Sequence, residues 1–194
     1  VQDTAIIDNT GSAGTLAIDA AWNIGNFDAS ARTSAMSLRL NSFSPVLYKD
    51  FKLGSGITTI YGQSYTSFQI SGTGLQTFTS NGVTLNWNIY LYNTGTFKLN
   101  DALTMPQSVL SFNSSSSGST FDANGYNVTV ASFTDTSNSN LLMGSGTWTL
   151  TGSGAVWKSN SLNTIDSTAA SIVLSGTTTT ARTFTTGTNQ YNKI

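Results

Sequence analysis

Residues 83–91 read Val-Thr-Leu-Asn-Trp-Asn-Ile-Tyr-Leu, an alternation of apolar and polar side chains over the whole stretch. This alternation is typical of a β-strand with one buried face, because successive side chains of a strand point to opposite faces. Turn-forming Asn-Gly pairs occur at 81–82 and again at 124–125. No segment has the sustained 3.6-residue apolar period of an amphipathic helix, so we expect an all-β chain.

A short pattern recurs on both sides of this stretch: an aromatic or large aliphatic residue, one spacer, and then usually Leu or Ala. Successive copies are separated by 24, 24, 22, 24, 27 and 24 residues. The first residues of the copies, which we call anchors, are Phe27, Phe51, Leu75, Phe97, Phe121, Trp148 and Ile172. Short strands on a continuing repeat predict a parallel β-helix (β-solenoid) with coils of about 24 residues. A β-sandwich is the alternative, but a sandwich would not keep one pattern in register at this period.

The spacer that follows each anchor is expected to point outward, so that the spacers of successive coils form a column. In this column two pairs of opposite charges would be neighbours: Asp28 beside Lys52, and Lys98 beside Asp122. The whole expected column is Asp28, Lys52, Gln76, Lys98, Asp122 and Thr149.

We expect residues 1–194 to form a single solenoid domain, with a less regular N-terminal coil or cap at 1–26. The next anchor would fall just after Ile194, so the repeat is cut rather than finished. An open solenoid end exposes unpaired strand edges, and we therefore expect the native chain to continue or another subunit to cover each end. No apolar run approaches 18 residues, so membrane insertion is not expected.

The composition is rich in Ser (28), Thr (31) and Asn (18), and poor in chemically reactive groups. The chain has no His, no Cys and no Glu, which excludes a Ser-His-Asp triad, a Cys nucleophile and a His or thiolate metal site. Its nine Asp are dispersed, and its eight Lys and Arg form no basic stripe for nucleic acid. We therefore predict no catalytic residue, no metal site and no cofactor.

Aromatic side chains are the remaining candidates for a binding role, because their rings can stack on sugars. Trp87 and Trp148 fall at positions expected to face the core. The candidates for glycan stacking at the surface are Trp157, Tyr90, Tyr92, Tyr61 and Tyr65.

Two stretches resemble a known class of proteins: 121–129, which reads FDANGYNVT, and 144–157, which reads GSGTWTLTGSGAVW. Residues 171–175 and 180–184 continue the likeness, which covers about 80–194. The chain resembles repetitive right-handed parallel β-helix proteins of bacteriophage tail fibres, other virion appendages and bacterial surfaces. These motifs are repeat-level and low in complexity, so they indicate architecture better than activity.

The resemblance implies a non-enzymatic rod in a phage virion appendage, a tail fibre or spike, that presents a face to a host-surface polysaccharide. It implies a homotrimer or contact with other appendage subunits, and a location on the virion or at the cell surface. A bacterial adhesin or extracellular matrix protein is the second possibility, and a polysaccharide-degrading tailspike is the third. Lyases of this architecture use clustered Asp with Arg or Lys, and only Asp28 with Arg32 and Arg39 partly matches that arrangement.

Overall fold

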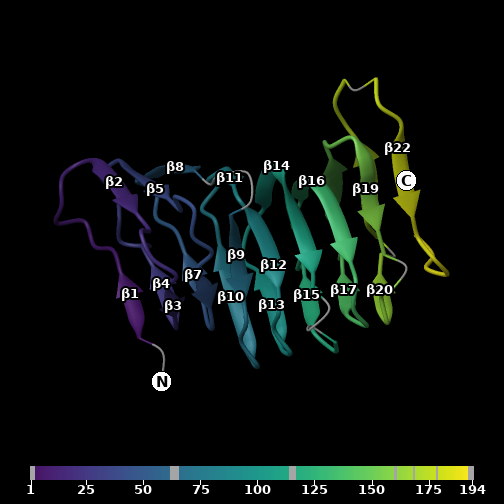
Figure 1. Ribbon diagram of the computed structural model, residues 1–194, viewed down its shortest axis with the longest axis horizontal. Helices are drawn as coiled ribbons and strands as arrows, with labels where there is room; N and C mark the ends of the chain where they lie inside the picture. Colours follow the sequence, from purple (N-terminus) through teal and green to yellow (C-terminus); the bar gives the residue numbers. More distant parts are fainter. Residues whose placement is uncertain are drawn as a thin grey trace.

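The computed structural model describes residues 3–61, 66–113, 117–159, 161–167, 169–177 and 179–191, without the side chains of 59–61. Its strands all pair in parallel with strands of neighbouring coils, and the coils stack along the long axis from the N-terminal to the C-terminal end (Figure 1). The predicted all-β parallel solenoid is therefore confirmed, with about seven turns. The described part of the chain contains no helix of the length and apolarity that a membrane span requires.

Sheet A forms one side of the solenoid from β1 to β20. Its strands, in spatial order, are β1 (Thr4–Ile6), β4 (Asn26–Asp28), β7 (Phe51–Lys52), β10 (Leu75–Thr79), β13 (Thr96–Leu99), β15 (Thr120–Asp122), β17 (Asn140–Leu142) and β20 (Thr164–Asp166).

Sheets B and C form the other two sides. Sheet B consists of β2 (Gly14–Ala17), β5 (Met36–Arg39), β8 (Ile57–Tyr61) and β11 (Leu85–Asn86). Sheet C consists of β3 (Asn23–Ile24), β6 (Val46–Leu47), β9 (Ser67–Ile70), β12 (Asn88–Leu91), β14 (Leu103–Phe112), β16 (Val128–Asp135), β18 (Thr147–Leu150) and β21 (Ser171–Leu174), together with β19 (Gly154–Lys158) and β22 (Arg182–Thr185).

The long strands β14 and β16 belong to two sides at once. The first half of β16 pairs with β18, whereas its second half pairs with β19. A bridge from Thr84 to Thr104 places the first half of β14 next to the sheet B side. The side begun by sheet B therefore continues through β18 and β21, and the side begun by β3 and β6 continues through β19 and β22.

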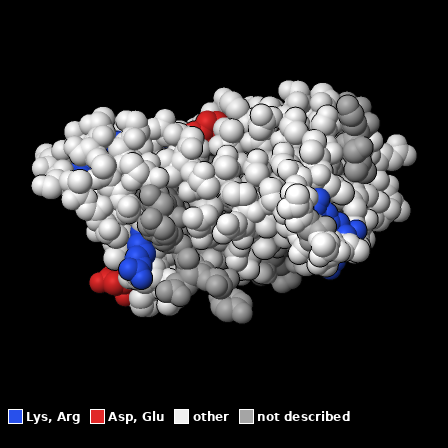
Figure 2. Space-filling model, turned by 90° about the horizontal axis from the view of Figure 1, so that it is seen from above, with Lys and Arg blue, Asp and Glu red and all other residues white. Residues whose placement is uncertain are grey.

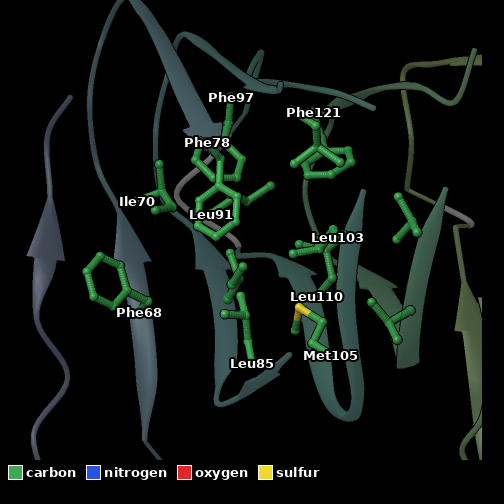
Figure 3. Close-up of a cluster of buried hydrophobic side chains, with 14 of the residues drawn as sticks. Phe68, Ile70, Phe78, Leu85, Leu91, Phe97, Leu103, Met105, Leu110 and Phe121 are labelled. Carbon is green, nitrogen blue, oxygen red and sulfur yellow. The ribbon is translucent and has the colours of Figure 1, made fainter. Parts of the chain in front are cut away.

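Alternating side chains of all three sides meet in one continuous hydrophobic core. Figure 3 shows Phe78 and Phe97 from sheet A lying in the same interior as Leu85 from sheet B and Leu91 from sheet C. Rings of successive coils also contact each other, as between Phe51 and Phe78, whose centroids are 5.0 Å apart with nearly parallel planes. Burial of these side chains is the main stabilising term of the fold, because each coil contributes large apolar groups.

Four predicted anchors point into this core from sheet A: Phe27, Phe51, Phe97 and Phe121. The prediction is wrong at Leu75, which is 65% exposed, because Phe78 is the residue that pairs with Phe51. Trp148 and Ile172 are buried and pair with each other, but they lie in β18 and β21 on another side.

The outward column of spacers is partly formed. Asp28 lies beside Lys52, and Lys98 lies beside Asp122 with 3.3 Å between Nζ and Oδ2. Thr149 lies on β18, outside this column.

Gln76 departs from the column because its side chain is buried. Its Oε1 accepts a hydrogen bond from the Gly72 amide at 3.1 Å, and its Nε2 donates to the carbonyls of Leu47 and Lys49. The amide group thereby satisfies backbone groups of a neighbouring turn, which explains a polar side chain at an inward position.

Residues 83–91 form two strands rather than one. Strand β11 ends at Asn86, β12 begins at Asn88, and the buried Trp87 lies at the corner between them. Just before this stretch Asn81 and Gly82 both have positive φ, 52° and 74°, as a tight turn of the mirror-image type requires.

Candidate functional site

Trp157 does not lie on the surface, contrary to the prediction. Its side chain is fully buried and stacks on Phe184, with ring centroids 5.4 Å apart. Its indole N–H donates to the hydroxyl of Tyr191 at 2.8 Å, and that hydroxyl also contacts Ser159. Burial raises the pKa of Tyr191 above its ordinary value. Trp157 is therefore a core residue that no glycan can reach.

Tyr90 and Tyr92 lie on the outer surface of sheet C. Both are half-buried, and they alternate along β12 and its continuation with the buried side chains of Ile89 and Leu91. Tyr61 is the last residue of β8, but its side chain and all of Tyr65 lie outside the described residues.

Tyr48 joins these two tyrosines, and sequence reasoning missed it. It follows the inward Leu47 as Tyr92 follows Leu91, and each of the two tyrosine amides donates to the coil before it. Ser71 and Asn113 take the same place in their coils, so the outward column runs Tyr48, Ser71, Tyr92, Asn113. The available indication was the run 45–47, where Pro precedes two apolar residues, followed directly by the tyrosine.

A second outward column runs beside the first one. Strand pairing aligns Gln69, Tyr90 and Ser111 across β9, β12 and β14, followed by Thr134 on β16. We call the following half-buried residues of the two columns the Tyr face: Tyr48, Gln69, Ser71, Tyr90, Tyr92, Ser111 and Asn113.

Charge distinguishes the Tyr face from the outer face of sheet A. Among the described residues of these two columns, none from β6 to β16 is charged. The outer face of sheet A carries the pairs Asp28–Lys52 and Lys98–Asp122. On the face seen from above in Figure 2, only a few charged side chains are visible, and most of the described surface there is uncharged.

The Asp residues mostly serve the backbone. The carboxylates of Asp8 and Asp28 each accept hydrogen bonds from the hydroxyl and amide two residues later. The hydroxyls of Thr10 and Ser30 are the main reason that the pKa of each carboxyl is lowered. Asp101 instead reaches across a coil to the amides of Ser80 and Asn81.

The partial resemblance to a lyase site around Asp28 is not realised in space. Arg32 is buried, and its guanidinium donates to the carbonyls of Ser34, Asp8 and Ser12. It therefore ties the first coil to the second instead of facing a groove. Among the described residues, no three His, Cys, Asp or Glu side chains lie close enough together to hold a metal ion.

Asp135 lies in an inward column of the core, although nothing in the sequence indicated an Asp there. Strand pairing aligns it with Phe112 and, through that residue, with Leu91, and its side chain is fully buried. Its Oδ1 accepts from the amide of Ser137 at 3.1 Å, whereas no described group donates to Oδ2. Burial raises the pKa of this carboxyl to about 6.

Comparison with known proteins finds no matching family, no similar curated protein and no similar solved structure.

Proposed function

We propose that this chain is a non-enzymatic structural rod of a surface appendage, in the first place a bacteriophage tail fibre or spike, that presents a glycan-binding face. The observation that carries the proposal is the unbroken core. One hydrophobic cluster extends from Ile18 to Ile172, and each coil pairs with its neighbours in parallel. Such a solenoid is stiff along its axis, because every coil buries its apolar side chains against the next.

The structural use of the carboxylates supports a non-enzymatic role. A glycosidase needs two carboxyl groups facing one substrate. The Asp side chains that accept backbone or neighbouring side-chain hydrogen bonds here are Asp8, Asp28, Asp50, Asp101, Asp122 and Asp135. Groups held in this way stabilise turns and coil contacts instead of facing a substrate in pairs.

Labelling with an antibody raised against the chain tests the location. We expect gold label along an appendage of virus particles purified from the source culture. Label on the cell envelope with none on particles would overturn the phage assignment in favour of an adhesin.

A reducing-end assay on a polysaccharide panel tests the absence of catalysis. We expect no release of sugar ends, and release that Asp28→Ala or Asp122→Ala abolishes would contradict the non-enzymatic role. Light scattering of the purified chain tests the homotrimer that the fibre resemblance leads us to propose, and a monomeric mass would overturn it.

A further inference from the structure

We infer that the Tyr face binds a neutral, extended polysaccharide that lies across the strands along the solenoid axis. The inference rests on the proposed function and narrows it to one side of the molecule and one class of ligand. It is carried by the placement of three tyrosines, by the hydrogen-bonding groups between them and by the lack of charged side chains among the described residues of the two columns from β6 to β16.

The three tyrosines lie on one outward face with two backbone spacings between them. Tyr48 and Tyr92 lie in one column two coil steps apart, about 9.6 Å between their backbones at the usual strand spacing. Tyr90 lies two residues from Tyr92 on the same strand side, about 6.6 Å along the strand. A chain of sugar rings that crosses the strands can therefore contact more than one tyrosine.

The Tyr92 ring is held by a neighbouring coil before any ligand arrives. Each of the three tyrosines is half-buried, so part of each residue remains open to solvent. Asn113 Nδ2 donates to the Tyr92 hydroxyl oxygen at 3.1 Å, which leaves the hydroxyl hydrogen to donate outward. A ring fixed in this way loses little conformational entropy on binding.

The groups between the rings match the chemistry of a sugar. Gln69 offers both amide donors and an acceptor, and Ser71 offers a hydroxyl. Ser111 Oγ donates its hydrogen to the Phe112 carbonyl at 3.2 Å and can still accept a hydrogen bond. Apolar C–H faces of a pyranose pack on phenol rings, while its hydroxyls bond to amides and hydroxyls nearby.

The absence of charge favours a neutral glycan over nucleic acid or an anionic polysaccharide. Single-stranded nucleic acid also stacks on aromatic rings, but its phosphates need a positively charged groove. The nearest cation along the chain is Lys49, which follows Tyr48 at the turn before β7, and Lys158 joins the second column only at β19. Neither column offers a row of cations to an anionic chain.

Binding of the chain to an array of immobilised neutral polysaccharides (glucan, mannan, xylan, galactan and chitin) tests this inference. Polygalacturonate and a single-stranded DNA serve as charged probes on the same array. We expect saturable binding to at least one neutral polymer, and each Tyr→Ala substitution at Tyr48, Tyr90 or Tyr92 should weaken it about tenfold.

Tyr126→Ala is the matched control, because that side chain is 39% exposed and lies outside the Tyr face. Tyr92→Phe keeps the ring and removes the hydroxyl, so it should retain more binding than Tyr92→Ala. Circular dichroism and thermal melting of every variant show whether the fold is kept.

Three results would overturn the inference: no binding to any neutral polymer, binding that survives all three alanines, or binding confined to the charged probes. Each is distinguishable from failure of the proposed function. An appendage that carries the antibody label but binds no neutral polymer would leave the structural role standing and remove only the assignment of the Tyr face.

Discussion

Asp135 gives the sharpest test of how the solenoid uses polar groups in its core. The inward column that contains Leu91 and Phe112 reaches Asp135 in the next coil, and the residue is fully buried there. Replacing Asp135 with Asn keeps the size and the acceptor for Ser137 but removes the ionisation. We predict that D135N is more stable than the natural chain at pH 8 and equally stable at pH 4.

The magnitude follows from the shift in the pKa of Asp135. Burial raises it from 3.8 to about 6 in the folded state, while the unfolded chain keeps the lower value. The folded state therefore binds more protons between these two values, and stability falls as pH rises from about 4 to above 6. A shift of about two units corresponds to about 3 kcal/mol, most of which is lost between pH 4 and pH 8.

Urea unfolding of both proteins at pH 4, 6 and 8 measures this difference, and the carboxyl ¹³C shift of Asp135 reports its pKa directly. D28N is the control with the opposite sign, because hydrogen bonds from Ser30 lower the pKa of Asp28. That carboxyl contributes stability above its unfolded pKa, and D28N should lose it at pH 8. The reasoning is refuted if D135N gains no stability at pH 8, or if the Asp135 carboxyl titrates near 4.

Further substitutions test the backbone packing and the charge pairs. Gly95→Ala should destabilise the fold by about 3 kcal/mol, because its Cβ would lie 2.1 Å from the Gly74 carbonyl oxygen. Gly74→Ala is the control, because a Cβ on Gly74 would meet no atom within 4 Å, and thermal melting of both variants measures the difference in stability. Arg32→Met removes three hydrogen bonds to carbonyls and should destabilise by about 3 kcal/mol, with faster amide exchange confined to the first two coils. Lys98→Met should change stability by less than about 1 kcal/mol, because the ion pair with Asp122 is partly exposed, and melting at low and high salt checks this.

The repeat was predictable from the sequence because each coil has the same alternation of inward apolar and outward polar residues. The side of the coil to which each apolar residue belongs was not predictable. Phe121 pairs in sheet A with Leu141, not with Trp148. The separation from Phe121 to Trp148 is therefore longer than one coil, because Trp148 lies on the next side of the following coil. All three sides share the same in–out alternation, so the sequence does not reveal which side a given apolar triplet joins. Leu75 fails because the inward residues of β10 are Gln76 and Phe78. Phe78, which pairs with Phe51, is followed by Thr79 and Ser80 and so lacks the pattern.

The candidate site was predicted in part. Tyr90 and Tyr92 were predictable as outward residues because they alternate with the inward Ile89 and Leu91 along β12 and its continuation. Trp157 was not, because Phe184 and Tyr191, which cover it, come about thirty residues later along the chain. The alternation of residues around Trp157 therefore does not indicate that residues of a later coil bury its side chain.

The polar residues of the interior bear on how one coil recognises the next. A solenoid with identical coils could slip by a whole coil and lose little, because every apolar column would still be filled. Here the column that contains Leu91 and Phe112 changes to Asp135, and Gln76 bonds to one particular turn. A slipped register would separate the buried Gln76 amide from the carbonyls of Leu47 and Lys49, which is unfavourable for a buried polar group, whereas the bond from Ser137 to Asp135 lies within one coil and would be kept. If D135N gains the predicted stability at pH 8, the ionised Asp135 carboxyl lowers the stability of the fold, and register specificity rests on groups that bond across coils, such as Gln76.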